Sequence, residues 1–204
     1  MIYDVSMAIT SKMTVYKNKE EKVPQFSTLS TFETGSSYET VLSMSLHTGT
    51  HMDYPLHMIN GGGVSGEQIS DGLIGEVKVF ETDQDVVDEA FVKTCDIQKG
   101  DVVFFKTRNS KIETFDFDFV YVDQDAAKTL AMIGIKGVGL DALGIERAQD
   151  GHPTHKILLG ANIFIIEGLR LKEVPEGRYE LIALPLKIIG VEALPMRVLL
   201  KTIE

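Results

Sequence analysis

Short apolar segments with high β-propensity recur along this 204-residue chain, and they limit its fold more than any other feature. They are rich in Val, Ile, Leu, Phe and Tyr, and polar or turn-forming segments separate them. Segments this short suit strands better than buried helices. Six of them predict strands, at residues 77–80, 101–106, 137–140, 162–166, 179–184 and 197–200.

Three segments between these strands predict helices, at residues 85–94, 123–133 and 143–148. The second has the clearest signal, since Asp123 and Asp125 place negative charge where the amide groups of a helix N-terminus are exposed. Strands alternating with helices indicate the mixed α/β class. No internal repeat or low-complexity linker divides the sequence, so we expect a single domain over residues 1–204.

Charge and composition argue against several kinds of partner. The formal net charge of −10 at pH 7 disfavours approach to nucleic-acid phosphates and to anionic membrane surfaces. Apolar runs such as residues 163–166 are far shorter than the roughly 20 residues of a membrane-spanning helix, and no signal peptide is recognisable. The single cysteine, Cys95, permits no intramolecular disulfide. We expect a cytoplasmic protein that acts on a small molecule.

Histidine and carboxylate side chains crowd into residues 47–57, His-Thr-Gly-Thr-His-Met-Asp-Tyr-Pro-Leu-His. Apolar and polar residues alternate before this segment, so we expect a strand through Leu46 that delivers His47 to a cleft, with Gly49 allowing the backbone to turn. A helix carrying His47 and His51 is disfavoured, because the intervening Thr-Gly-Thr has low helix propensity and a proline follows closely.

This cluster predicts a divalent metal site, because imidazole nitrogen and carboxylate oxygen are donors that Zn²⁺, Mn²⁺ and Fe²⁺ accept. A lone histidine is more often an ordinary packing residue, but three of the five histidines share this segment. The other two, His152 and His155, precede Glu167, which ends an apolar run and needs a cation or a partner if buried. These residues alone are compatible with two alternatives. They hold a second metal, or Glu167 is a solvated glutamate and the histidine lies on a surface turn.

The glycines at 61–63, after Asn60, predict a tight or mobile loop, since consecutive glycines are costly in a regular element. A loop that flanks a site and a plain surface turn are equally compatible with this composition.

The sequence resembles the putative cyclase family, which includes bacterial kynurenine formamidases and isatin hydrolase-like enzymes. The family signature His-x-Gly-Thr-His-x-Asp-x-Pro-x-His is complete at residues 47–57 and is highly specific. Weaker similarity covers most of the remaining chain, at residues 139–143, 155–159, 167–169, 185–188 and 195–197.

The resemblance implies a swivelling β/β/α fold around a central mixed β-structure, assembled as a homodimer or higher homo-oligomer. It also implies one metal held by His47, His51 and Asp53, a second position at which Asp53 is joined by His155 and Glu167, and His57 as proton donor and acceptor. Zinc is the favoured cofactor and manganese the alternative, with one or two ions per chain.

One departure from the family concerns the substrate. Its formamidases carry a Trp-Pro-Gly-Asp-like segment near the N-terminus that contacts the aromatic substrate, whereas this chain has no Trp. Residues 13–18 match that region, and Tyr16 either stacks on a substrate ring or is an ordinary packing residue. The roles of His152 and of the charged segment 17–22 stay open.

We expect amide hydrolysis by a metal-activated water, with N-formylkynurenine giving formate and kynurenine and His57 moving the protons. Hydrolysis of a cyclic amide such as isatin, a cyclase or dehydratase reaction, and a non-catalytic metal-stabilised binding protein are the alternatives. A nucleophilic Ser or Cys is disfavoured, because no Gly-x-Ser-x-Gly elbow occurs and Cys95 has no evident base nearby in sequence.

Overall fold

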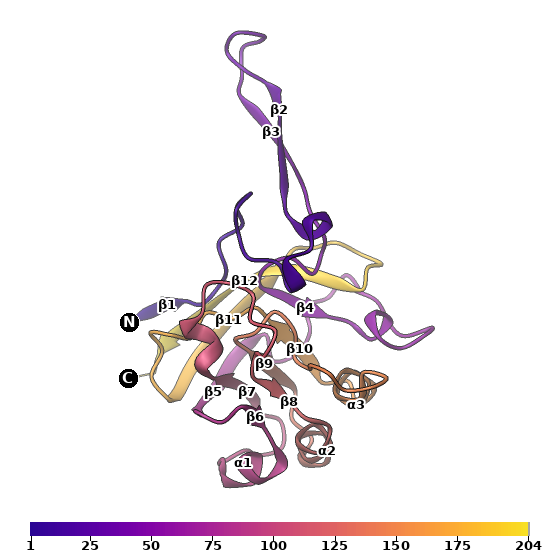
Figure 1. Ribbon diagram of the computed structural model, residues 1–204, viewed down its shortest axis with the longest axis vertical. Coiled ribbons are helices and arrows are strands. Elements are labelled where there is room, and N and C mark those ends of the chain that lie inside the picture. Colours follow the sequence, from indigo (N-terminus) through magenta and orange to yellow (C-terminus); the bar gives the residue numbers. More distant parts are fainter. Residues whose placement is uncertain (204) are drawn as a thin grey trace.

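A closed barrel of mixed strands forms the centre of the computed structural model, which describes residues 1–203 (Figure 1). Around the barrel the order is β12 (Ala193–Thr202), β11 (Gly177–Pro185), β5 (Ile74–Glu81), β7 (Val102–Lys106), β9 (Gly137–Leu140), β10 (Phe164–Glu167) and β4 (His51–Asp53). Pairing of β4 with β12 closes it, and β1 (Ile2–Asp4) pairs with the other end of β12. The strands from β5 through β7 and β9 to β10 run parallel, and the other neighbours run antiparallel. Each of the six predicted strands overlaps one of these, so the mixed α/β class is confirmed.

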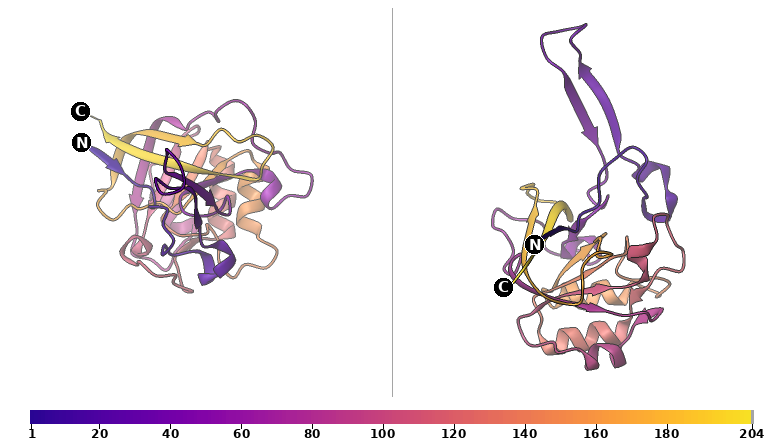
Figure 2. Two further views of the ribbon diagram at one scale, coloured as in Figure 1. Left: turned by 90° about the horizontal axis from the view of Figure 1, so that it is seen from above. Right: turned by 90° about the vertical axis from the view of Figure 1, so that its left-hand side faces the viewer.

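Three helices lie together on one side of the barrel: α1 (Glu89–Thr94), α2 (Gln124–Ile133) and α3 (Pro153–Gly160) (Figures 1 and 2). The helix predicted at residues 123–133 is confirmed as α2. Its N-cap is Asp123, whose carboxylate accepts a hydrogen bond from Ala126 N at 2.7 Å, and it ends at Gly134, which has φ of 80°. The two signals that define this helix are therefore local.

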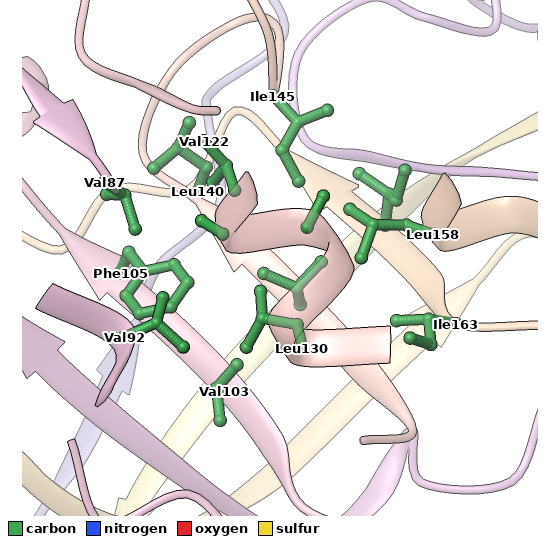
Figure 3. Packing of buried hydrophobic residues seen from close by; sticks show 14 of the residues in the cluster. Val87, Val92, Val103, Phe105, Val122, Leu130, Leu140, Ile145, Leu158 and Ile163 are labelled. Atoms are coloured by element: carbon green, nitrogen blue, oxygen red, sulfur yellow. The ribbon is translucent and has the colours of Figure 1, made fainter. Parts of the chain in front are cut away.

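Alternate side chains of the parallel strands enter two different apolar cores. On β7, Val103 and Phe105 face the helices, whereas Phe104 faces the barrel interior. Figure 3 shows Val103 and Phe105 packed near Leu130 of α2. Because both faces of β7 are buried, its first four residues, Val102 to Phe105, are all apolar rather than alternating.

The helix expected at residues 143–148 is wrong. This segment consists of bends and irregular backbone, and Ala148 has a left-handed φ of 53°. The backbone hydrogen bonds of Ile145 go to distant parts of the chain: its N–H donates to the Glu167 carboxylate, and its carbonyl accepts from Val122 N. These tertiary contacts replace the bonds of a helix.

The helix expected at residues 85–94 begins later than predicted. Its first residues form β6 (Val86–Val87), which pairs with β8 (Tyr121–Val122), and α1 starts only after Asp88. The Asp88 carboxylate accepts from Phe91 N at 2.8 Å and so serves as the N-cap.

The strand expected through Leu46 is also wrong as placed. The strand in this region, β3 (Glu39–Ser43), ends earlier and pairs with β2 (Gln25–Ser30) in a hairpin that projects away from the barrel (Figures 1 and 2). We call residues 25–43 the arm. All residues of β3 are exposed, so its alternating pattern selects no buried face. Leu46 lies in a turn, and the chain rejoins the barrel only at β4.

Short 3-10 turns complete the structure: η1 (Tyr16–Asn18), η2 (Glu20–Lys22), η3 (Pro55–His57) and η4 (Arg108–Lys111). The glycines at 61–63 fold back on η3, where Leu56 N donates to Gly63 O at 2.9 Å. They therefore lie beside the turn that carries His57. Within residues 1–203, no helix has the length and apolarity to cross a membrane.

Candidate metal centre

Two of the predicted ligands lie on β4, two residues apart and therefore on one side of the strand. His51 and Asp53 are almost fully buried. The turn before β4 depends on Gly49, with φ of 73°, and the carbonyl of Gly49 accepts from His51 Nδ1 at 2.9 Å. That hydrogen bond leaves His51 Nε2 free to face the other ligand side chains.

Glu167, the last residue of β10, lies opposite His51 in the antiparallel pair of β10 with β4. The next residue, Gly168, has φ of 72°, and a Cβ placed there would lie 2.6 Å from Gly49 O. The strand end and the loop before β4 can approach this closely only because residue 168 is a glycine.

The histidine and carboxylate side chains meet around Asp53. Its Oδ1 lies 3.0 Å from His47 Nδ1 and 3.4 Å from His51 Nε2, and its Oδ2 lies 3.6 Å from His155 Nε2. Glu167 Oε2 lies 3.4 Å from His51 Nε2, and Glu167 Oε1 lies 3.2 Å from His155 Nε2. The structure thus brings together all five residues for which the resemblance implied metal binding. His155 reaches this cluster from α3, rather than from a surface turn.

The cluster fits a divalent cation. His51 Nε2 and both carboxylate oxygens of Asp53 are buried and have no hydrogen bond to any described residue. Buried polar atoms without a partner are rare in native proteins and commonly indicate an ion or a water. The nitrogen and oxygen donors, without thiolate, suit zinc or a similar divalent metal.

The charges in the cluster also favour a cation. Burial lowers the pKa of His51, but the Asp53 and Glu167 carboxylates outweigh this effect and raise it to about 9. Burial raises the pKa of Asp53, but contacts with His155, His47 and His51 hold it well below its usual range. The buried carboxylates therefore require nearby positive charge, which either protons or a metal ion supply.

Glu146 belongs to the site and was missed by sequence reasoning. Its Oε1 lies 2.5 Å from His155 Nδ1 and 3.2 Å from His152 Nδ1, and its Oε2 accepts from Thr154 N at 3.0 Å. The contact with Nδ1 turns His155 so that Nε2 faces Asp53 and Glu167. No sequence signal distinguished Glu146 within a segment that we expected to be an ordinary helix.

His57 lies at the end of η3, beside the ligand cluster. Its ring centroid is 4.1 Å from that of His47 and 5.5 Å from that of His155. Burial lowers the pKa of His57 to about 4, although the Asp53 carboxylate opposes the effect. The imidazole is therefore neutral at pH 7.

A cavity of about 270 Å³ opens beside these side chains. Tyr16, Lys17 and Lys22 line it together with His57, and the half-exposed His152 also lies on its wall. The charged N-terminal segment, whose role was open from the sequence, thus borders the candidate site.

Residues 3–147 match the family model described as Putative cyclase. Over 98% of its length the chain is 31% identical to the kynurenine formamidase of Salinibacter ruber, and it covers 97% of that protein. The chain belongs to the Putative cyclase family. The kynurenine formamidase of Sphingopyxis alaskensis is 33% identical over 78% of each chain.

Solved structures of similar proteins agree with this membership. A predicted metal-dependent hydrolase from Bacillus stearothermophilus is 50% identical with a TM-score of 0.90, covering 98% of this chain and 97% of that one. Isatin hydrolase A from Labrenzia aggregata, at 24% identity, shares the fold with a TM-score of 0.81, over 98% of this chain and 93% of that one. The family resemblance and the fold are confirmed, and the donor clusters support a divalent metal in this member of the family.

Proposed function

We propose that this protein is a metal-dependent amidohydrolase of the arylformamidase type, which converts N-formylkynurenine and water to formate and kynurenine. The proposal rests on one observation above all: imidazole and carboxylate groups from β4, the loop before it, α3 and β10 converge around buried polar atoms that have no hydrogen bond within residues 1–203. Identity of 31% to a kynurenine formamidase over almost the whole chain supports the substrate.

In this proposal His47, His51 and Asp53 hold one divalent cation, and Asp53, His155 and Glu167 provide a second position. Zinc is favoured over manganese, because three imidazoles in the set suit zinc. What a divalent cation supplies in such a site is Lewis acidity toward a carbonyl oxygen and a lower pKa for water.

His57 moves the protons. Because its pKa is about 4, its ring is unprotonated at pH 7 and a ring nitrogen can accept the proton of the attacking water. The same nitrogen then returns the proton to the amine nitrogen as the C–N bond breaks. The lowered pKa makes protonated His57 a stronger acid than an ordinary imidazolium, which favours this return.

A cysteine nucleophile is inconsistent with the environment of Cys95. Burial raises the pKa of its thiol to about 11, and Sγ donates to Phe91 O at 3.4 Å. The reactive thiolate is therefore scarce at neutral pH, and Cys95 does not line the cavity beside the histidines.

The decisive experiment is hydrolysis of N-formylkynurenine by the purified, metal-loaded protein, with isatin as a second substrate. We expect His57→Ala to lower kcat by about 10² to 10⁴ while elemental analysis shows unchanged metal content. His152→Ala, which alters another histidine on the cavity wall, is the matched control and should retain most activity. Turnover of isatin without turnover of N-formylkynurenine would replace the formamidase assignment by cyclic-amide hydrolysis.

We also propose a homodimer in which a second copy covers the arm. Large apolar side chains on the arm are 45–76% exposed: Phe26, Leu29, Phe32, Tyr38, Val41 and Leu42. They present on the order of 600 Å² of surface, compared with the roughly 800 Å² that each partner buries in a standard interface. An isolated two-stranded hairpin is marginally stable, so a covering partner would stabilise the arm. A cytoplasmic location stays a prediction.

A further inference from the structure

Two lysines border the cavity beside the ligand cluster, and neither belongs to the catalytic groups described above. Lys17 Nζ lies 5.3 Å and Lys22 Nζ lies 5.5 Å from the centroid of the Tyr16 ring, and all three side chains line the cavity. An aromatic face with two ammonium groups near it thus forms part of the cavity wall. We call these three residues the cationic rim.

The ammonium groups of the rim are available to a ligand. Across residues 1–203, Lys17 and Lys22 form no ion pair with a carboxylate, whereas Lys19 between them lies 3.8 Å from Glu21. Unpaired positive charge beside a cavity attracts anions.

The rim is held in place by its surroundings. Lys17 and Asn18 have left-handed φ values of 56° and 52°, a conformation that asparagine tolerates and that lysine adopts rarely. Thr48 Oγ1 donates to Lys22 O at 3.1 Å, which ties the segment to the residue after His47.

Tyr16 is fixed by packing on two sides. Its ring contacts that of Phe115 edge-on at 5.2 Å, and a Cβ at position 144 would lie 3.2 Å from Tyr16 Cε2. The close approach of Gly144 lets the Tyr16 ring sit against the backbone at the cavity. These two contacts fix the position of the Tyr16 ring on the cavity wall.

We propose that the cationic rim binds a carboxylate of the substrate, so that the enzyme selects aromatic amides that carry a carboxylate over those that lack one. This inference rests on the proposed amidohydrolase function and names its substrate class. The substrate ring packs on Tyr16, and the carboxylate accepts hydrogen bonds from Lys17 and Lys22. Apart from the histidines, the ionisable groups on the cavity wall are Lys17, Lys22, Glu146, Glu167 and the Tyr16 hydroxyl, so the two lysines supply its ammonium groups.

The test compares N-formylkynurenine with its methyl ester, which has the same scissile amide and the same α-ammonium group but no carboxylate. Metal-loaded wild type, the double variant Lys17→Gln/Lys22→Gln and the control Lys19→Gln are assayed. We expect wild type and Lys19→Gln to prefer the acid about tenfold or more in kcat/KM. The double variant loses this preference through a higher KM for the acid, with kcat and the ester reaction little changed. Added salt should weaken the preference in wild type and have little effect in the double variant.

The inference is overturned if the double variant keeps the preference for the acid, or if it slows both substrates equally with an unchanged melting temperature. If wild type hydrolyses neither compound, the proposed function fails, and the rim is tested by calorimetric binding of kynurenine and kynurenine methyl ester. Tighter binding of the acid, lost in the double variant and retained in Lys19→Gln, supports the rim. Equal affinity of wild type, the double variant and Lys19→Gln for kynurenine would contradict the proposed role of the rim.

Discussion

At the scale of single residues, Glu146 has the clearest untested role. Its carboxylate contacts His155 Nδ1 at 2.5 Å and accepts from the first turn of α3 at Thr154 N. A histidine that binds metal through Nε2 commonly donates Nδ1–H to a carboxylate, which sets the ring orientation and raises its basicity. Glu146 is thus expected to act on the metal through His155 without touching the metal itself.

We predict that Glu146→Ala lowers metal affinity by roughly 10- to 100-fold, because His155 loses the acceptor that orients it. Competition with a chromogenic chelator measures this affinity. Glu146→Gln retains an acceptor oxygen and should lose less, and Glu180→Ala, at an exposed carboxylate on the outer surface, should bind as wild type does. Equal affinity of Glu146→Ala and wild type would contradict the orienting role.

At the scale of elements, the site depends on the close approach of the end of β10 to the loop before β4. Thr50 Oγ1 donates to Gly168 O at 2.7 Å, and Gly168 N donates to Ala142 O at 2.6 Å. The bond from Thr50, together with the pairing of β10 with β4, holds His51 and Glu167 on neighbouring backbones. Separating the two elements would therefore separate ligands that lie 3.4 Å apart.

We predict that Gly168→Ala destabilises the protein by about 2 kcal/mol or more and lowers Tm by several degrees. Its φ of 72° is unfavourable for alanine, and the new Cβ would lie 2.6 Å from Gly49 O. The matched control is Gly160→Ala in α3, where the nearest neighbour of a new Cβ is Ile59 Cδ1 at 3.9 Å. That variant should be neutral or slightly stabilised. Calorimetry that found the two variants equal would refute the explanation.

At the scale of the whole molecule, the buried charges of the ligand cluster make the stability of the fold depend on whether a metal ion or protons neutralise them. Contact with carboxylates raises the pKa of His51 to about 9 and that of His155 well above its usual value, despite opposing burial. When no metal is bound, the two protonated imidazoles stabilise the fold. This contribution is complete below the unfolded-state pKa near 6.5 and is lost as pH rises toward 9.

We therefore predict that the metal-free protein becomes less stable between pH 6.5 and about 9, whereas the metal-loaded protein changes little over this range. The pKa of His57 is lowered to about 4, so its contribution to stability is complete above pH 6.5 and is lost as pH falls toward 4. It is therefore constant between pH 6.5 and 9. At saturating metal, Tm should rise by roughly 10 °C. Thermal melts with and without chelator measure both effects. A pH-independent Tm of the metal-free protein in this window would contradict the prediction.

The arm gives a prediction about assembly. Replacing its exposed aromatic residues, as in Phe26→Ser/Phe32→Ser, should convert a dimer to monomers, because these side chains supply much of the apolar surface that a second copy would cover. Light scattering after gel filtration measures the mass. Phe117→Ser, at an aromatic residue that is 62% exposed outside the arm, should leave the dimer intact. A wild-type protein that is monomeric at high concentration would exclude this dimer.

Local signals in the sequence were sufficient for the strands and for α2. Each barrel strand beyond β4 overlaps an apolar segment whose length and composition suit a strand, and Asp123 and Gly134 cap α2 through contacts only a few residues away. Motif spacing likewise predicted the ligand-rich segment 47–57, because three histidines and an aspartate in one short polar segment are rarely accidental. The helix α3 also begins with a local signal, a proline in its first turn, although it was not predicted.

The tertiary structure alone decided how distant segments meet. Residues 143–148 have a helix-like composition, but Ile145 bonds to Glu167 and Val122, far away in the chain, so no helix forms. The alternation in β3 resembles a half-buried strand, yet the arm has no layer to cover it. Glu146 joins the site because α3 places His155 beside it, and Lys17 and Lys22 border the cavity through contacts with Thr48 and Tyr16. Patterns along a chain report nearest neighbours, whereas these placements depend on contacts between segments that only the closed barrel brings together.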